Sequence, residues 1–216
     1  MDERFKLKRG DKLLLATHNE GKLKEFAFLF APFGLEIISA GQLGLPEPIE
    51  DGISFKQNAA IKAHASAKAA NMIALADDSG LCVDALGGAP GIYTADWAEK
   101  PDGSRDFDIG MKRVEDELQK ANAIKTEQRK ASFNATLCLA LPSAEEMFFI
   151  GKIDGEMVWP PRGDIGFGFD PVFMPKGHEK TFGEMSSEKK HSYKKDEKGL
   201  SHRARAFAKL VGECCE

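Results

Sequence analysis

Two adjacent carboxylates, Asp77 and Asp78, have the clearest potential for chemistry in this sequence, because they directly follow a short apolar run. Acidic side chains beside a buried strand are poor choices for folding unless a cation, a helix cap or a proton transfer uses them. Side chains alternate along a strand, so only one of the pair can face a given site. An earlier loop carries Glu47 and Glu50, and the two loops together offer oxygen ligands of the kind that Mg²⁺ takes. A turn or a helix N-cap explains the Asp pair equally well.

A second candidate site is the pattern Thr17-x-Asn19-x-x-Lys22, which supplies a hydroxyl, an amide and an ammonium at the start of an expected helix. Free N–H groups and the positive end of the helix dipole favour phosphate at such a position. The phosphate-loop pattern G-x-x-x-x-G-K-[ST] is absent from the sequence. The residues therefore indicate a polyphosphate site of another kind, or a helix that Asn19 merely caps beside a solvated Lys22.

Aromatic and basic side chains form a third group near the C-terminus. The glycine-rich segment 166–171 contains Phe167 and Phe169, which suit stacking on a flat base or, alternatively, belong to the core. Ser201 is expected to cap the last helix, and it is followed by the basic pair His202-Arg203. Cations at a helix N-terminus are mildly unfavourable, which points to an anionic partner there.

Apolar and turn patterns predict the elements that must position these residues. Strands are expected at 12–16, 36–40, 73–76, 133–141 and 147–153, and helices at 22–30, 54–71, 104–124 and 201–214. The strand at 73–76 is expected to end at Asp77-Asp78-Ser79-Gly80, and the last two strands are expected to pair antiparallel. Strands that alternate with helices indicate a mixed α/β fold.

Composition restricts the function classes. The 216 residues are 42% hydrophobic and 30% charged, which is typical of one globular domain. A net charge of −4, from 30 basic and 34 acidic residues, gives no overall positive field for nucleic acid, so no nucleic-acid partner is expected. The first ten residues lack a signal-peptide pattern, and no segment is apolar enough to span a bilayer. Four cysteines without a C-x-x-C pair fit a reducing cytoplasm.

Five sequence blocks, in order along the chain, resemble the inosine triphosphate pyrophosphatase family, also called the dITP/XTP pyrophosphatases. The blocks are LLLATHNEGKLKEF (13–26), EDGISFKQNAAIKA (50–63), ALADDSGLCVDALGGAPGIYTADWA (74–98), GDIGFGFDPVF (163–173) and GLSHRARAF (199–207). Because they extend over almost the whole chain, chance is a weak explanation for the resemblance.

The resemblance implies a single two-lobed α/β domain over residues 1–216, with a mixed central sheet, flanking helices and an active site in the cleft between the lobes. It also implies a homodimer and Mg²⁺-dependent hydrolysis of ITP, dITP, XTP and dXTP to the monophosphate and pyrophosphate. Two other classes remain open: another Mg²⁺-dependent nucleotide phosphohydrolase or phosphotransferase, and a non-catalytic nucleotide-binding module. Pyrophosphate release distinguishes the first, and turnover distinguishes the second.

The same resemblance assigns roles to individual residues. The residues that would hold the phosphates are Thr17, His18, Asn19, Glu20, Gly21, Lys22 and Lys62. Those that would hold the base and sugar are Phe167, Gly168, Phe169, Asp170, Lys190, His202 and Arg203. Glu50 and Asp78 would bind the metal, with Asp78 also acting as the general base and Ser79 contacting substrate. Water would then attack the α-phosphorus, with pyrophosphate leaving.

Two departures from the family pattern leave alternatives open. The connection 191–200 is longer than expected, so Lys189 competes with Lys190 for the substrate contact. The acidic loop varies within the family, so Glu47 competes with Glu50 for the metal.

For the base, hypoxanthine and xanthine share a 6-keto acceptor beside an N1–H donor that adenine lacks, and Asp170 is the expected reader of that edge.

Overall fold

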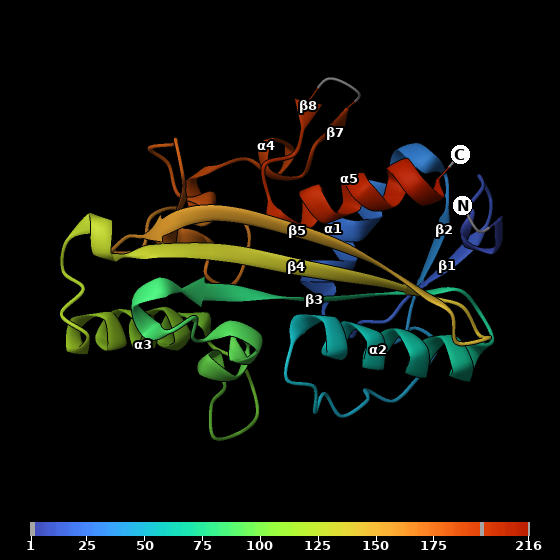
Figure 1. The fold of residues 1–216 in the computed structure, drawn as a ribbon, viewed down its shortest axis with the longest axis horizontal. Coiled ribbons are helices and arrows are strands. Elements are labelled where there is room, and N and C mark those ends of the chain that lie inside the picture. Colours follow the sequence, from blue (N-terminus) through green and yellow to red (C-terminus); the bar gives the residue numbers. More distant parts are fainter. Residues whose placement is uncertain (1–2, 195–196, 216) are drawn as a thin grey trace.

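A six-stranded mixed sheet forms the centre of the protein in the computed structural model, which describes residues 3–194 and 197–215 (Figure 1). The strand order is β2-β1-β3-β4-β5-β6. The strands are β1 (Lys12–Leu15), β2 (Glu36–Ser39), β3 (Ala74–Val83), β4 (Lys130–Ala140), β5 (Glu146–Met157) and β6 (Phe173–Pro175). Strands β1, β2 and β3 pair in parallel, whereas β3 to β6 pair antiparallel. The predicted fold class, a mixed sheet with flanking helices, is thereby confirmed.

Helices cover both faces of this sheet. They are α1 (Glu20–Phe30), α2 (Phe55–Ala70), α3 (Phe107–Lys120), α4 (Ser187–His191) and α5 (His202–Cys214). Figure 1 shows α1 and α5 on one face and α2 on the other. A two-stranded hairpin, β7 (Tyr193–Lys194) with β8 (Glu197–Lys198), lies in the long connection 191–200, and Lys195 and Asp196 of that connection lie outside the described residues.

Side-chain caps fix where the site-bearing helices begin. The Asn19 side chain accepts a hydrogen bond from the Lys22 N–H (3.1 Å) at the start of α1. Ser54 caps α2 through the Gln57 N–H (3.3 Å). Ser201 caps α5 through the Ala204 N–H (3.1 Å), as the sequence predicted. These caps place the N-terminal ends of α1 and α5, which carry the predicted site residues, at defined positions beside the sheet.

The two faces of the sheet are packed differently. Aromatic side chains fill the α1–α5 face, where Phe30 and Phe207 meet edge to face at 4.7 Å between ring centroids. The α2 face is built from small residues instead, with Ala59, Ala63 and Ala67 packed against the sheet. Small side chains allow close approach of a helix to a sheet, so α2 lies near enough for its own polar residues to reach side chains of β3.

Strand β3 differs from the prediction. The strand was expected to end at Ala76, but it runs on through Asp77 to Val83. β3 pairs with β4 along its whole length, and this pairing keeps the polar residues of β3 in extended conformation. Asp78, for example, lies opposite Thr136. On its other edge β3 pairs with β1 only as far as Leu75, because β1 is short. Polar residues in the middle of the strand are therefore tolerated beside an open edge.

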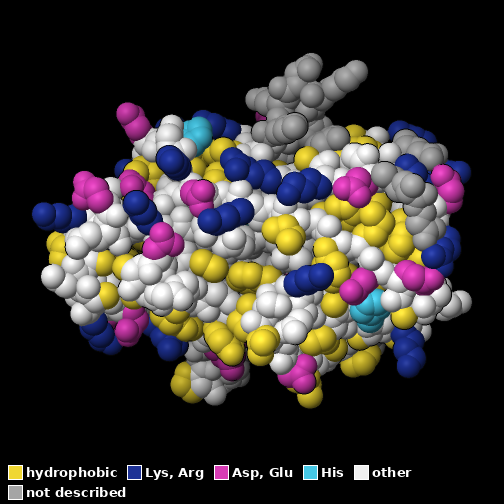
Figure 2. Space-filling view, in the orientation of Figure 1, with side chains coloured by type: hydrophobic (Ala, Val, Ile, Leu, Met, Phe, Trp, Pro, Cys, Tyr) yellow, Lys and Arg dark blue, Asp and Glu magenta, His cyan; other side chains and the backbone are white. Residues whose placement is uncertain are grey.

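The surface fits the balanced composition. On the face seen in Figure 2, acidic and basic side chains are interspersed with exposed hydrophobic ones. Within the described ranges, no helix is both long and apolar enough to cross a membrane.

Candidate active site

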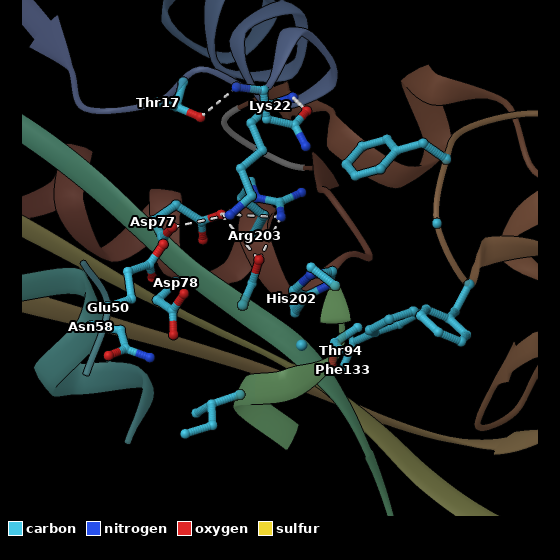
Figure 3. Close-up of a pocket in the computed structure, with 18 of the residues that line it drawn as sticks. Thr17, Lys22, Glu50, Asn58, Asp77, Asp78, Thr94, Phe133, His202 and Arg203 are labelled. Carbon is cyan, nitrogen blue, oxygen red and sulfur yellow. Dashed lines mark hydrogen bonds and ion pairs between the residues drawn. The ribbon is translucent and has the colours of Figure 1, made fainter. Parts of the chain in front are cut away.

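A cavity of about 730 Å³ opens at the free edge of β3, beyond its last pair with β1 (Figure 3). Its walls come from the β1–α1 turn, the acidic loop, α2, the middle of β3, the 166–170 segment and the start of α5. The lining includes every predicted site residue except Glu20 and Gly21. Gly21 nevertheless lies close to the site, because a Cβ added there would be 3.4 Å from the Phe167 ring.

Backbone groups at the open edge of β3 bond to side chains instead of to a strand. The carbonyl of Asp77 accepts a hydrogen bond from Lys22 Nζ (3.1 Å), and the N–H of Leu81 donates to Thr94 Oγ1 (2.9 Å). Ser79 lies between these two positions on the strand, so its backbone groups face the cavity. The edge is therefore a row of polar groups available to a ligand.

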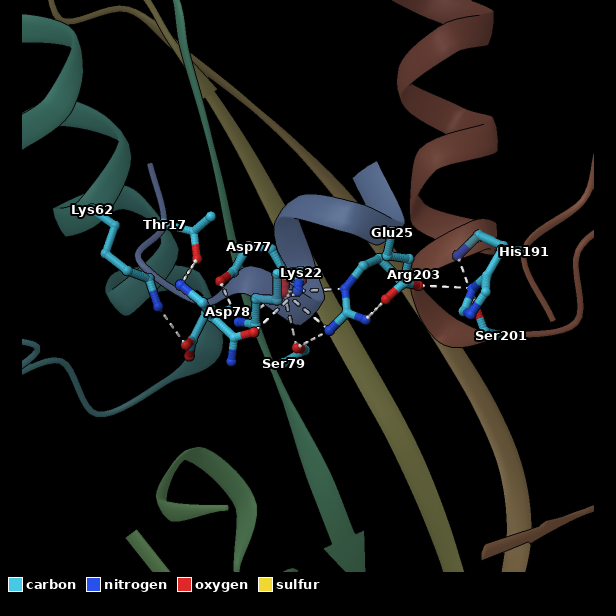
Figure 4. Close-up of polar contacts among 12 residues, drawn as sticks. Thr17, Lys22, Glu25, Lys62, Asp77, Asp78, Ser79, His191, Ser201 and Arg203 are labelled. Carbon is cyan, nitrogen blue, oxygen red and sulfur yellow. Dashed lines mark hydrogen bonds and ion pairs between the residues drawn. The ribbon is translucent and has the colours of Figure 1, made fainter. Parts of the chain in front are cut away.

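Asp77 and Asp78 point to opposite faces of β3, as the alternation of strand side chains predicts (Figure 4). Asp77 faces α1 and α5, where it meets Lys22 and Arg203. Asp78 faces α2, where it meets Lys62. Both reach the cavity because no strand covers the edge between them, and their different partners give them different chemistry.

Lys62 joins the two predicted metal ligands. Its Nζ donates to Asp78 Oδ1 at 2.8 Å and to Glu50 Oε2 at 2.5 Å. Burial by itself would lower the pKa of Lys62, but the charges of Asp78 and Glu50 outweigh it and raise the pKa. Burial raises the pKa of Asp78 to about 6, although Lys62 opposes that shift. At pH 7 Asp78 is thus ionised, yet it is a stronger base than an ordinary aspartate.

The acidic loop is held against α2 so that Glu50 faces this cluster. Asn58 Oδ1 accepts a hydrogen bond from the N–H of Gly52 (2.9 Å), and His18 Nε2 lies 2.8 Å from the carbonyl oxygen of Leu45. Glu47 also lines the cavity, but Glu50 is the residue that shares the Lys62 cation with Asp78.

The donor set fits a magnesium ion. Asp78 Oδ2 is buried and has no hydrogen-bond partner among the described residues, and a second carboxylate, Glu50, lies on the other side of a shared cation. In the part of the chain that the structure describes, no three His, Cys, Asp or Glu side chains converge into a closed cage. Mg²⁺ suits such an open site, because it commonly takes one or two carboxylates and completes its shell with water and phosphate oxygens.

Asp77 is the centre of a second cluster, in which one of its carboxylate oxygens meets three partners. Its Oδ2 accepts hydrogen bonds from Arg203 Nε (3.2 Å) and Ser79 Oγ (3.0 Å) and lies 2.9 Å from Lys22 Nζ. Burial would raise the pKa of Asp77, but the Arg203 and Lys22 charges outweigh burial and hold it far below its usual range. Asp77 is therefore too weak a base to accept a proton, and its contacts orient Lys22, Ser79 and Arg203.

Two residues of this cluster, Glu25 and His191, were missed by the sequence reasoning. Buried Glu25 pairs with Arg203 Nη1 and lies 2.8 Å from His191 Nδ1. Burial would raise the pKa of Glu25, but Arg203 and His191 lower it to about 2. The available signal was an acid at a core position of α1, next to Phe26 and one turn after Lys22. His191 begins the long 191–200 connection, so that connection is tied to the site.

The end of the cavity beside the 166–170 segment contains Lys190, not Lys189. Lys190 is 1% exposed and its Nζ donates to Asp170 Oδ2 and to the carbonyl of Ile165, both at 2.9 Å, whereas Lys189 is exposed and outside the lining. One ammonium hydrogen remains for a ligand. Asp170, the expected reader of the base edge, also lines the cavity, and one of its carboxylate oxygens is engaged by Lys190.

The two predicted stacking rings have different environments. Phe169 is 2% exposed and packs in the core, edge to face with Phe107 at 5.8 Å between centroids. Phe167 is 40% exposed at the cavity and is the ring available for stacking. Phe169 is buried because it belongs to the hydrophobic cluster beneath this segment, whereas Phe167, two residues earlier, lies at the cavity.

His202 offers a neutral polar edge at the same end of the cavity. Its ring stacks on Phe133 at 4.9 Å between ring centroids, and its buried Nδ1 has no hydrogen-bond partner within 3–194 and 197–215. Burial, reinforced by the Arg203 charge, lowers the pKa of His202 to about 3. The imidazole is therefore uncharged at neutral pH and presents one donor and one acceptor, which suits an uncharged heterocycle.

Arg203→Met should lower the free energy of unfolding by about 3–5 kcal/mol, because the buried Asp77 and Glu25 carboxylates lose their main counter-charge. Urea denaturation measures the change. A matched control is Arg129→Met, which breaks the buried Arg129–Glu115 pair outside the cavity. Both variants should lose stability, but only Arg203→Met should also lose activity when assayed well below its melting temperature. A stability loss under about 1 kcal/mol would mean that the ion pairs of Arg203 contribute no more than exposed ion pairs do.

Known proteins resemble this chain over nearly its whole length. The model of the Ham1 family matches residues 13–213. A dITP/XTP pyrophosphatase from Mesorhizobium japonicum is 58% identical over 203 residues, which are 94% of this chain and 92% of that protein. One from Bartonella quintana is 59% identical over 94% of each chain. Among solved structures, a HAM1 protein from Coxiella burnetii has a TM-score of 0.78 at 30% identity and covers 94% of this chain and 97% of its own.

Proposed function

The chain belongs to the Ham1 family, and we infer that it is a hydrolase of non-standard purine nucleoside triphosphates such as dITP and XTP, which it cleaves to the monophosphate and pyrophosphate. One observation supports this function most directly. A single cavity has two lysines and a basic carboxylate at one end, and an exposed aromatic ring with neutral and cationic donors at the other. Such a cavity accommodates a triphosphate and a base together.

We propose that the triphosphate lies against Lys22, Lys62 and the N-terminus of α1. Lys22 is 18% exposed and Lys62 10% exposed, so each ammonium is close to solvent yet fixed by carboxylates. Thr17 and Asn19 shape the turn that precedes the helix, with Thr17 Oγ1 accepting a hydrogen bond from the Asn19 N–H (3.1 Å). Positive charge held in place before the reaction stabilises the negative charge that develops on the leaving pyrophosphate.

We propose that Asp78 accepts the proton of the attacking water. A new bond forms between the water oxygen and the α-phosphorus, and the bond from that phosphorus to the bridging oxygen breaks. The electron pair leaves with pyrophosphate, which the lysines neutralise. Glu50 and Asp78 would hold a magnesium ion, which when bound supplies further positive charge to the phosphates.

The base end supports selection for keto purines. We propose that Phe167 stacks on the ring, that the remaining Lys190 N–H donates to the 6-keto oxygen, and that His202 bonds elsewhere on the base. Arg203 is oriented by Asp77, Ser79 and Glu25, and its guanidinium lies 5.9 Å from the Phe167 ring centroid, so it forms the wall behind the base. Adenine presents a 6-amino donor to Lys190, and two donors repel.

A panel of nucleoside triphosphates with separate detection of pyrophosphate and orthophosphate tests the function. We expect pyrophosphate and the monophosphate in equal amounts, with ITP and XTP turned over fastest, and no product after metal is removed with a chelator. Orthophosphate as the main product would mean cleavage at the γ-phosphate, and tight binding without turnover would mean a binding module.

Two further expectations from the sequence concern the assembly and the location of the protein. We propose that two copies of the chain associate, and that the enzyme acts in the cytoplasm, where the nucleotide precursors of nucleic acids are used. The mass of the protein in solution and its fractionation from cells measure these features directly.

A further inference from the structure

Lys62 occupies an unusual position for a phosphate-binding lysine. Its ammonium lies directly between Glu50 and Asp78, the two carboxylates proposed to hold the metal, at 2.5 and 2.8 Å (Figure 4 shows the Asp78 contact). The lysine side chain is 10% exposed, and the carboxylates come from segments far apart in the sequence. Without a cation between them, two carboxylates at this separation would repel each other.

A divalent cation held by this pair of carboxylates would lie close to the ammonium. A magnesium ion contacts carboxylate oxygens at roughly 2.0–2.1 Å, closer than the ammonium does, and would take oxygens from the same two residues. An ammonium left in contact with the same carboxylates would repel the ion at short range in a partly buried site. Asp78 Oδ2 has no hydrogen-bond partner in the described part of the chain, but Glu50 Oε2 and Asp78 Oδ1 are both engaged by Lys62.

A bound triphosphate would offer the Lys62 ammonium an alternative partner. The long, flexible side chain of this lysine extends from α2 into the cavity, where a triphosphate offers several anionic oxygens at once. Lys22 differs in this respect. It is bound to Asp77 and to the Asp77 carbonyl, where Arg203 remains as a counter-charge without it, and it contacts neither Glu50 nor Asp78.

We propose that Lys62 is the resident cation of the Glu50–Asp78 pair, that it competes with the divalent metal in the nucleotide-free protein, and that the triphosphate opens the metal site by drawing Lys62 away. This inference rests on the proposed function of the same cavity. It makes metal and nucleotide binding mutually reinforcing, since any ligand that removes Lys62 from the carboxylates strengthens metal binding, and the reverse holds by linkage.

The test is a titration of nucleotide-free protein with Mn²⁺, followed by electron paramagnetic resonance of the free ion. We expect Lys62→Met to bind Mn²⁺ at least about 10-fold more tightly than the wild type, since removing a competing charge worth about 1.4 kcal/mol gives that factor. Lys22→Met removes the same charge nearby and should change Mn²⁺ affinity by less than about 3-fold. Both variants should bind the triphosphate more weakly.

A second arm uses the α,β-methylene analogue of ITP, which resists cleavage, with its own Mn²⁺ affinity measured separately. The analogue should strengthen Mn²⁺ binding strongly in the wild type and much less in Lys62→Met. Lys62→Gln provides a second variant should Lys62→Met fail to fold, and Mn²⁺ should raise the melting temperature of either variant more than that of the wild type.

The outcomes separate this inference from the proposed function. If Lys62→Met bound Mn²⁺ with the same affinity as the wild type, or more weakly, the proposed competition would be overturned. The assignment of the metal site would stand. If no variant binds Mn²⁺ even with the analogue, the Glu50–Asp78 assignment is wrong and the competition is rejected with it. If Lys22→Met tightened Mn²⁺ binding as much as Lys62→Met does, the effect would come from the overall charge of the cavity, and the competition would be rejected.

Discussion

Asp78→Asn should lower kcat by at least about 10²-fold at saturating Mg²⁺, because general-base catalysis alone contributes roughly 10²–10⁴. The substitution keeps the size of the side chain but removes both the proton-accepting oxygen and the charge that a metal needs. Steady-state kinetics with pyrophosphate detection measures the loss. Near-normal turnover would reject Asp78 as the base and as a metal ligand.

Asp78→Asn should keep most of its stability, which would show that its loss of turnover is catalytic and not a folding defect. The pKa of Asp78 is raised from its usual 3.8 to about 6 in the folded protein, so the folded state binds the proton more tightly than the unfolded one. The wild type therefore loses stability from this group as pH rises from about 4 to about 6. A neutral Asn at pH 7 should cost little, because Glu50 remains as the partner of Lys62. Asp77→Asn is the contrast: the pKa of Asp77 is lowered, its charge stabilises the fold at neutral pH, and its removal should destabilise.

Wild-type kcat/KM for ITP should exceed that for ATP by about 10⁴, because a site that hydrogen-bonds a polar edge can reject a mismatched analogue by about 10⁴–10⁵. Lys190 is the residue expected to read the keto oxygen, with Asp170 holding it in position. Lys190→Met should therefore lower the ITP-to-ATP ratio by about 10²-fold, in keeping with the loss of one buried charged hydrogen bond.

The adjacent lysine supplies the control. Lys189 has the same side chain one residue earlier but is exposed and outside the cavity, so Lys189→Met should keep the full ratio. Asp170→Asn should lower the ratio by less than Lys190→Met, because Lys190 retains its bond to the Ile165 carbonyl. Equal cleavage of ATP and ITP by the wild type, or an unchanged ratio in Lys190→Met, would show that base selection has another origin.

Local patterns in the sequence predicted those parts of the site that local structure determines. Asn19 and Ser201 act as helix caps, and Lys22 follows the first of them within the same turn. These features depend on a few consecutive residues, so a pattern of a few residues is enough to find them. The opposite orientations of Asp77 and Asp78 likewise follow from strand geometry alone.

Features that depend on residues distant in the sequence could not be predicted in the same way. The extension of β3 through Asp77 depends on pairing with β4, more than fifty residues later. The burial of Phe169 beside an exposed Phe167 depends on what packs beneath the segment. The role of Glu25 depends on Arg203 and His191, which come from the other end of the chain and surround it.

The alanine face of α2 has a consequence for how this protein can evolve. Ala59, Ala63 and Ala67 never face the cavity, yet the thickness of that packed layer sets how far the backbone of Lys62 stands from Asp78. Replacing one of these methyl groups by a larger side chain would push the helix outward, and displacements of about 1 Å at a catalytic group can cost 10²-fold in rate. Selection on the reaction therefore reaches residues that no substrate touches, and a mutational map of activity should show a stripe of intolerance running down the buried side of this helix.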